Sequence, residues 1–363
     1  MRLRTVVLRA IAGSLLGIAG SAVSAAAMDD LQGSVVLNEE AINEVRNDID
    51  RRVQVAGYTD VEYILDSKAG KYPGFRMHHL SLFFKKKINE KWRWFSEIEF
   101  EDAPKHEFVN DGSNAVDTGY GKIFVEAVNL DYVWKPELSV RVGRFFTPAG
   151  IWSVDHYPPF VPTQERPGHI RKLFPQLADG LMAFGTIKLG GMFFKYDAYL
   201  SNGDGNTGHH DQNAEKALGL KGDLVLPMFQ HLSVGGSFYT DPKDSAKTDL
   251  IRTAFGAHAK LRAGNLTLQT EGGYRKNVWD ANDATLFSAS GYYVQAMYAL
   301  GKIAAGYRYD NFWSDRSDAA KETLTNTVFV NYRIDANLVL KAEHHMMDSG
   351  DTKTVFSAVA YLE

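Results

Sequence analysis

The stretch WRWFSEIEFE, residues 92–101, contains the pattern that decides the fold. Its apolar residues alternate with charged ones: Trp92, Trp94, Ile98 and Phe100 against Arg93, Glu97, Glu99 and Glu101. A period of two is that of an extended strand, because successive side chains of a strand point to opposite faces. A strand with one apolar and one charged face fits either a soluble β-sandwich or a barrel whose outer surface meets lipid. The stretch therefore predicts an all-β protein and leaves two architectures open.

Segments with the same alternation recur along the chain from residue 51 onward. We count sixteen predicted strands, at residues 51–65, 75–88, 92–101, 121–134, 138–146, 178–188, 192–202, 215–226, 232–240, 249–262, 266–276, 285–300, 303–312, 322–334, 338–348 and 353–362. None of the eleven prolines falls within them, as expected for paired strands, since proline cannot donate a ladder hydrogen bond. An even number of strands of about ten residues is typical of a bacterial outer-membrane barrel.

The connections between the predicted strands alternate in length. Every second one is short, at residues 89–91, 135–137, 189–191, 227–231, 263–265, 301–302 and 335–337. The others are mostly longer and polar, as at residues 103–120, 202–214, 241–248 and 314–321. Outer-membrane barrels have short periplasmic turns and longer extracellular loops, whereas a soluble sandwich has no reason to sort its connections. We therefore predict a transmembrane antiparallel β-barrel of about sixteen strands over residues 51–363.

The start of the chain is different in kind. Residues 1–27 are typical of a cleaved secretory signal, with a basic start, a short apolar core and small residues: Arg2, Arg4, Arg9, residues 10–18 and residues 21–27. Residues 28–50 are predicted to be a periplasmic segment, either a short amphipathic helix or a poorly ordered terminus. Removal of the signal takes the net charge from −4 to −7, which argues against a nucleic-acid partner. The absence of cysteine excludes disulfides and thiolate metal sites.

One long connection, at residues 146–177, holds six of the eleven prolines. Proline breaks helices and cannot pair in a central strand, so this segment is predicted to be irregular. An irregular segment of this length inside a compact domain is usually evidence against the assignment of its neighbouring elements, or else a functional loop. It follows the fifth predicted strand and is the third connection on the side of the long loops. We expect it to fold into the barrel mouth and narrow a pore.

Several blocks of the sequence resemble the phosphate-selective porin O/P family of Gram-negative outer-membrane porins. They are FSEIEFE at 95–101, VNLDY at 128–132, VGRFFTPAG at 142–150 and SNGDG at 201–205. The resemblance covers roughly residues 51–363. It implies a sixteen-stranded channel in the outer membrane, commonly a homotrimer, whose third extracellular loop folds inward. The last residue of this chain is Glu363, whereas such barrels usually end with an aromatic residue.

The charges on the predicted inner face are balanced. The register turns ten basic residues inward, which are Arg93, Arg141, Lys195, Lys221, Arg252, Lys260, Arg275, Arg308, Arg333 and Lys341. It also turns ten acidic residues inward, which are Asp60, Glu62, Glu97, Glu99, Asp131, Asp197, Asp223, Glu271, Asp310 and Glu343. Most of these are expected to pair and brace the wall.

The long connection is less balanced than the wall. The candidate constriction residues are Arg141, Arg144, Arg166, His169, Arg171 and Lys172, opposed by Asp155 and Glu165. Because fixed cations in a constriction replace the hydration of an anion, we expect passive diffusion of small hydrophilic solutes with a mild, phosphate-like anion preference. The expected partners are outer-membrane lipid and small ions or solutes.

Other chemistry is less well supported. Three histidine pairs occur, His78–His79, His209–His210 and His344–His345. Neighbours on a strand point to opposite faces, so the first and third pairs are not expected to chelate a metal. The second pair lies in a predicted loop, where solvated histidines are the commoner case, so no metal site and no cofactor are predicted. Ser153, Asp155 and His156 lie close together without a nucleophile elbow, so an outer-membrane hydrolase is a less favoured alternative. A non-conducting barrel that anchors a partner is the other alternative, and conductance separates it from a channel.

Overall fold

A computed structural model of the chain describes residues 52–104, 107–108, 116–117, 121–203, 211, 213–227, 231–242, 250–279 and 285–362. The chain divides into two units, residues 1–52 and 53–363, and the second holds almost all described residues. The predicted signal peptide 1–27, the predicted periplasmic segment 28–50 and the His209–His210 pair lie outside the described residues. No helix among the described residues is long and apolar enough to cross a membrane.

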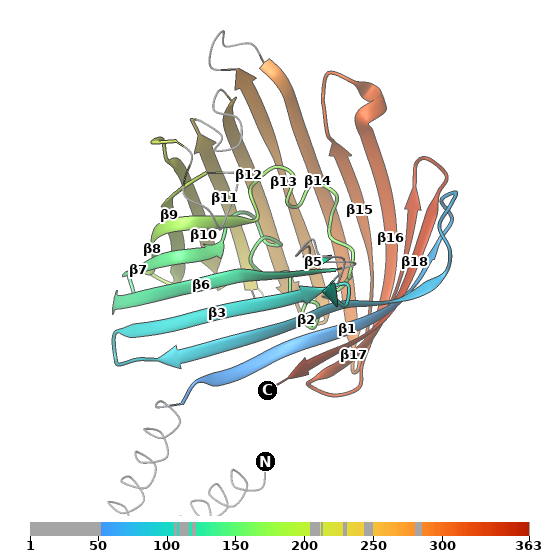
Figure 1. Cartoon of the computed structure of the whole chain (residues 1–363), viewed down its shortest axis with the longest axis horizontal. Helices are drawn as coiled ribbons and strands as arrows, with labels where there is room; N and C mark the ends of the chain where they lie inside the picture. The colour runs from blue at the N-terminus through green and yellow to red at the C-terminus, as the bar shows by residue number, and fades with distance from the viewer. Residues whose placement is uncertain are drawn as a thin grey trace, which may run out of the picture. The chain divides into compact units, whose positions relative to one another are not determined.

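The second unit is a closed antiparallel barrel of sixteen strands (Figure 1). Its strands are β1 (Gln54–Asp66), β2 (Gly74–Lys87), β3 (Trp92–Glu101), β6 (Lys122–Lys135), β7 (Leu138–Phe146), β8 (Leu177–Leu189), β9 (Met192–Ser201), β10 (Ala217–Leu226), β11 (His231–Asp241), β12 (Leu250–Ala263), β13 (Leu266–Trp279), β14 (Thr285–Leu300), β15 (Ile303–Trp313), β16 (Glu322–Arg333), β17 (Leu338–Met347) and β18 (Thr352–Leu362). The prediction of an all-β antiparallel barrel with sixteen strands is confirmed.

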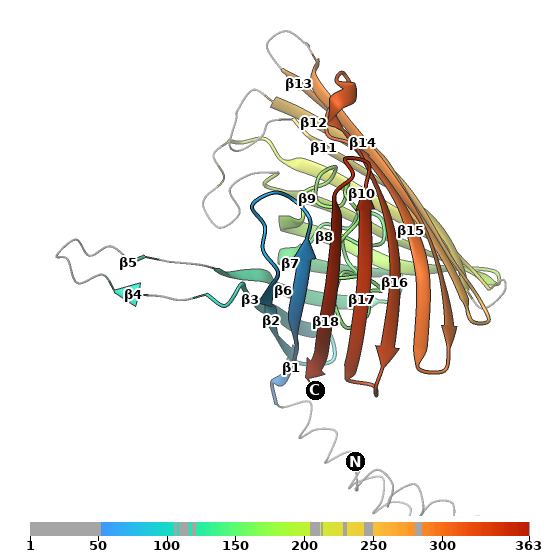
Figure 2. The same ribbon diagram turned by 90° about the vertical axis from the view of Figure 1, so that its right-hand side faces the viewer.

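Each strand pairs with its neighbours in chain order, with one interruption. β3 pairs directly with β6, because the short β4 (Glu107–Phe108) and β5 (Val116–Asp117) form a separate two-stranded sheet. A short 3₁₀ helix, η1 (Ala319–Lys321), lies between β15 and β16. The barrel closes where β1 pairs with β18, in the register that sets Tyr58 opposite Tyr361 (Figure 2). Closure gives the first and last strands a partner and removes the free sheet edges.

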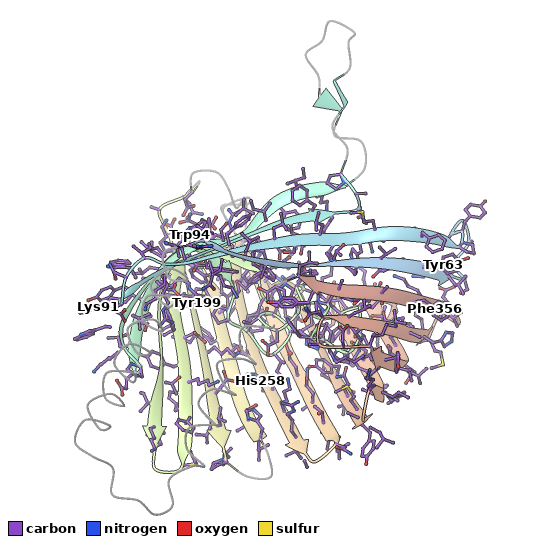
Figure 3. All side chains as sticks on the ribbon, turned by 90° about the horizontal axis from the view of Figure 1, so that it is seen from below. Tyr63, Lys91, Trp94, Tyr199, His258 and Phe356 are labelled. Atoms are coloured by element: carbon purple, nitrogen blue, oxygen red, sulfur yellow. The ribbon has the colours of Figure 1, made fainter. Side chains whose placement is uncertain are left out.

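The outer face of the barrel is apolar and exposed. Val142, Leu181, Leu200 and Leu218 form one row across β7 to β10, and each is between 37% and 51% exposed. Tyr63 and Phe356, paired across β1 and β18, lie together at one end of the wall (Figure 3). Apolar rows of this extent on an outer surface match the lipid-facing band of a membrane barrel.

The inner face carries the buried charges. They include Asp60, Glu62, Glu97, Glu99, Glu271, Arg308, Asp310, Lys341 and Glu343. Burying a charge is costly unless it is paired or hydrogen-bonded. These side chains therefore need partners inside the barrel, and much of what they bind belongs to the connection between β7 and β8.

Two β-bulges change the faces that strict alternation predicts. The pairing of β1 with β2 shifts between Asp60 and Val61, which leaves His78 as an extra residue beside His79. The prediction that His78 and His79 point to opposite faces is therefore wrong, because the bulge turns both rings toward Asp60. A second shift, between Glu97 and Ile98, leaves Glu126 of β6 as an extra residue that is fully buried.

Candidate pore constriction

Residues 147–176, which connect β7 to β8, lie inside the ring of strands; we call them the inner loop (Figure 1). The loop is first held against β11 and β13. The Gly150 N–H donates to Ser237 Oγ over 3.1 Å, and the N–H groups of Ile151 and Trp152 donate to Glu271 Oε2 over 2.9 and 3.2 Å. The loop makes several turn hydrogen bonds within itself, and side chains of the wall satisfy further backbone N–H groups that have no partner in the loop.

Basic side chains of the opposite wall bind carbonyl groups of the inner loop. Arg308 donates to Thr163 Oγ1 over 2.6 Å and to the Glu165 carbonyl over 3.0 Å. Lys341 Nζ donates to the Val161 carbonyl over 2.8 Å and also to the carbonyl of Pro158. Arg333 donates to the carbonyl of Pro159 over 3.1 Å.

Acidic side chains of the same wall bind N–H groups of the inner loop. Glu343 accepts from the N–H groups of Gln164 and Glu165, over 2.9 and 3.0 Å. Asp310 accepts from the Gly168 N–H over 3.0 Å. The charged side chains of β15 to β17 thus hold the loop. The carboxylates accept hydrogen bonds from its N–H groups, and the basic side chains donate hydrogen bonds to its oxygen atoms.

A cavity of about 940 Å³ remains on the other side of the inner loop. It is bounded by β3, β6 to β12 and the start of the loop. Its charged lining consists of Arg141, Lys195, Lys221, Lys260 and Arg262, with His231, His258, Asp155, Asp197 and Asp223. Five fixed cations face three carboxylates, so the open part of the lumen is more basic than the wall as a whole.

Some of these cavity charges are neutralised locally. Arg141 donates to both oxygens of Asp131, over 2.7 and 2.8 Å. Lys221 Nζ lies 3.4 Å from Asp223, whose other oxygen lies 2.5 Å from His258 Nε2. These groups form fixed pairs along the wall, which reduces their effect on a passing ion.

Three cations remain without such a partner. Lys195, Lys260 and Arg262 make no ion pair with any described residue. They lie on β9 and β12, and two carboxylates of the same cavity, Asp155 and Asp197, also form no ion pair with a described residue. These three side chains are therefore the cavity cations whose charge no nearby described carboxylate neutralises.

The arginines of the inner loop face a different environment. Arg171 Nη2 lies 3.7 Å from Glu126 Oε1, at the buried acidic cluster of Glu97, Glu99 and Glu126. Arg171 has a positive φ of 63°, in the left-handed region. Burial and the neighbouring Arg171 lower the pKa of Arg166 to about 10. Neither arginine lines the main cavity.

The two histidines of the inner loop are buried, and Glu165 is half-buried. Burial, with the charge of Arg308, lowers the pKa of His169 to about 4. Burial likewise lowers the pKa of His156 well below its usual value. Burial would raise the pKa of Glu165, but the ammonium of Lys353 outweighs it and the pKa is lowered. At neutral pH the loop therefore holds neutral imidazoles and an ionised Glu165.

The structure separates the constriction residues that the sequence groups together. Arg144 lies on the outer face of β7, where it donates to both oxygens of Asp179 over 2.7 Å, so its expected place in the constriction is wrong. Alternation explains this, because Arg144 shares its face with the exposed Val142. Lys172 is exposed and does not line the main cavity, whereas Asp155 does.

The other predicted wall residues lie on the inner face. Arg93 pairs in register with Asp131, and Lys195 lines the cavity. Arg252 lies on the same face of β12 as the buried Ala254 and His258. The Ser153, Asp155 and His156 cluster shows no hydrogen bond from Ser153 Oγ to the His156 ring among the described contacts, and no nucleophile–base pair is formed.

Several residues of the lumen are absent from the predicted inner face, among them Glu126 and Arg262. Glu126 is turned inward only by the bulge opposite Glu97 and Ile98, and a strict period of two places it outside. Arg262 lies two residues after Lys260 and four after His258, both of which point inward, so the period of two already predicts that it points inward. A bulge has no comparable mark, because one extra residue looks like a slip of the period.

No known family model matches the chain. A curated relative, an uncharacterized protein of Aquifex aeolicus (strain VF5), is 30% identical over 157 residues, which is 43% of this chain. The match spans about a third of that relative's length, namely 33%.

Solved structures with a similar fold are outer-membrane proteins. An anion-selective porin from Comamonas acidovorans has a TM-score of 0.61 at 11% identity, covering 86% of this chain and 99% of that one. OmpT, an outer membrane protein of Vibrio cholerae in its trimer form, has a TM-score of 0.55 at 14% identity, covering 85% and 99%. The outer membrane channel DcaP of Acinetobacter baumannii has a TM-score of 0.53 at 13% identity, covering 85% and 97%. The chain therefore has the barrel fold of outer-membrane porins.

Proposed function

We propose that the protein is an outer-membrane channel for the passive diffusion of small hydrophilic solutes. The observation that carries the proposal is the cavity of about 940 Å³ beside the inner loop, inside a closed barrel with an apolar outer face. The loop narrows the lumen because wall charges hold it on the side of β13 to β17, and the solute path follows β6 to β12. A polar path inside an apolar wall is the general design of a diffusion pore.

The proposed selectivity is a mild preference for anions. It rests on the wall and not on the loop, since Lys195, Lys260 and Arg262 lack ion-pair partners among the described residues while Arg166 and Arg171 lie toward buried carboxylates. Fixed cations attract anions and raise the local concentration of anionic solutes. Because several sequence blocks resemble the phosphate-selective porin O/P family, we include phosphate-like anions among the proposed solutes.

The location and assembly follow from the same proposal. Residues 1–27 would direct export and be removed, and residues 28–50 would remain in the periplasm. The barrel would lie in the outer membrane of a Gram-negative bacterium, in contact with its lipid. A homotrimer is proposed from the sequence resemblance and from the trimer form described for one similar barrel. The mechanism that we propose requires no cofactor and no covalent chemistry.

Planar-bilayer recording tests the proposal. Mature protein purified from outer membranes should insert and give stepwise conductance that rises with salt concentration. In a KCl gradient the reversal potential should take the sign of anion preference. Folded and inserted protein without conductance would contradict the channel and support a barrel plugged by its inner loop. Conductance with cation preference would contradict only the proposed selectivity.

A further inference from the structure

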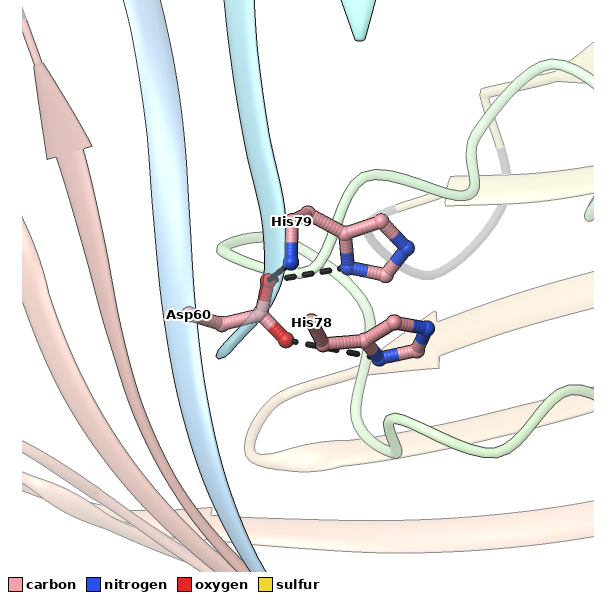
Figure 4. A group of neighbouring side chains, drawn as sticks. All are labelled: Asp60, His78 and His79. Atoms are coloured by element: carbon pink, nitrogen blue, oxygen red, sulfur yellow. Dashed lines mark hydrogen bonds and ion pairs between the residues drawn. The ribbon is translucent and has the colours of Figure 1, made fainter. Parts of the chain in front are cut away.

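Two adjacent histidines of β2 converge on one carboxylate of β1. In a regular strand His78 and His79 would point to opposite faces. The bulge opposite Asp60 instead makes His78 the extra residue, and the two imidazole rings stack with their centroids 3.5 Å apart. Both rings turn Nδ1 toward Asp60 (Figure 4). The local backbone therefore brings three potential metal ligands to one point.

The distances are close to those of a tetrahedral site. His79 Nδ1 lies 2.9 Å from Asp60 Oδ1, and His78 Nδ1 lies 3.7 Å from Asp60 Oδ2. The ligand atoms of Asp60, His78 and His79 all lie within 4.8 Å of one another. Zinc bonds of about 2.0–2.2 Å in a tetrahedron separate neighbouring ligand atoms by about 3.3–3.6 Å. Small rotations of the two rings would satisfy that geometry.

A fourth ligand is available in Glu62. Its Oε1 lies 3.0 Å from His78 Nδ1. The residue is only 2% exposed, and its Oε2 accepts no hydrogen bond, with Arg76 Nη1 at 3.6 Å as the nearest ion-pair partner. A buried carboxylate oxygen without a hydrogen bond is unusual, because such groups are costly to bury. This oxygen is an independent indication that the cluster has unused coordinating capacity.

We propose that Asp60, Glu62, His78 and His79 form a binding site for one divalent transition-metal ion of the Zn²⁺ type. Two neutral imidazoles and two carboxylates neutralise a charge of +2. Imidazole ligands favour Zn²⁺ and its neighbours in the first transition series over Mg²⁺ or Ca²⁺, which prefer oxygen. The site does not line the proposed solute path, so the metal-site proposal does not depend on whether the protein is a channel.

The surroundings support the ligands and connect them to the inner loop. His79 Nε2 lies 3.9 Å from Glu101 Oε1, where a carboxylate would fix the ring while Nδ1 binds the metal. Gln164 Nε2 of the loop donates to Asp60 Oδ2 over 2.6 Å. A metal ion bound to that oxygen takes the place of the Gln164 amide group. The ion would therefore bind where the loop meets β1.

Cobalt and zinc binding test this site in the full mature protein, folded in detergent and free of a histidine tag. All variants carry His209→Gln and His210→Gln, which remove the histidines of the loop after β9. Co²⁺ alone is titrated while its visible absorption is recorded, and Zn²⁺ is then added in competition. We expect about one Co²⁺ per chain with the intense bands of tetrahedral coordination, displaced by Zn²⁺.

Variants locate the ion. His78→Gln with His79→Gln should weaken binding by at least a hundred-fold, and Glu101→Gln should weaken it about ten-fold. The matched control is His344→Gln with His345→Gln, an adjacent pair on β17 without a bulge, which should bind as before. Unchanged binding after loss of His78 and His79 would overturn the site. If that variant does not fold, Asp60→Asn decides in the same way, and absence of tetrahedral bands in the parent protein overturns the proposal outright.

Discussion

Neutralising the three unpaired cavity cations should reverse the ion selectivity that we propose. The variant carries Lys195→Gln, Lys260→Gln and Arg262→Gln. It leaves two fixed cations, Arg141 and Lys221, against the three carboxylates of the cavity lining. Both remaining cations lie in ion pairs along the wall. The cavity would therefore change from a net basic to a net acidic lining.

The size of the effect follows from elementary electrostatics. At about 10 Å in water, one fixed charge contributes about 0.4 kcal/mol to the energy of a passing monovalent ion. Screening at 0.1 M salt, with a Debye length of about 10 Å, reduces this to about 0.15 kcal/mol. Three charges change the energy of an anion by about 0.5 kcal/mol and that of a cation by the opposite amount. The anion-to-cation permeability ratio should fall about five-fold.

Reversal potentials in a KCl gradient measure this ratio directly. The matched control removes the same charge from three exposed lysines outside the cavity lining, as Lys68→Gln, Lys71→Gln and Lys321→Gln. A second comparison is Arg171→Gln, which removes a loop cation beside Glu126 and should change the ratio little. The reasoning is refuted if the cavity variant and the control shift the potential equally, or if the loop variant shifts it more. Lower salt should enlarge the difference between variant and parent.

Three further outcomes are expected. Lys341→Met removes the ammonium group that binds loop carbonyls, so conductance and current noise should rise and the free energy of unfolding should fall by roughly 3 kcal/mol. Arg144→Gln should leave the reversal potential unchanged, because the guanidinium lies on the outer face with Asp179. The pKa of His169 is about 4 in the folded chain, so the unfolded chain binds the proton first as pH falls below about 6.5. Above that pH, His169 is neutral in both the folded and the unfolded chain and does not lower the free energy of unfolding. Between pH 6.5 and 5, the free energy of unfolding should fall by about 2 kcal/mol through this residue.

Each outcome has its own check. Single-channel recording and urea unfolding in detergent report on Lys341→Met, and an unchanged conductance would mean that the ammonium does not hold the loop. A shifted reversal potential for Arg144→Gln would show that the Arg144 side chain acts on ions in the lumen. For the pH effect, unfolding free energies of the parent and of His169→Gln are compared at pH 7.5 and 5. The buried His156 acts in the same direction, so only the difference between the two proteins measures His169. Equal losses in both proteins would contradict the reasoning.

The amino-acid sequence determined the barrel, because its information is local and periodic. Alternation in the stretch from Trp92 to Glu101 assigns an apolar and a charged face, and a register slip would expose every charge to lipid. The strand count follows from repeating that pattern, and the prolines mark the connections. The inner loop was also visible in the sequence, since six prolines between two strands leave no regular structure.

Only the tertiary structure decided which charges face one another. Alternation in the sequence predicts ten basic and ten acidic residues on the inner face. In the structure, Arg308 and Lys341 hold the inner loop, whereas Lys195 and Lys260 line the cavity. That division depends on contacts between residues more than a hundred positions apart, which no local pattern encodes. Two bulges, at Glu126 and His78, also turned side chains inward against the period. A bulge is set by pairing between strands, and its position becomes apparent only when the partner strand is in place.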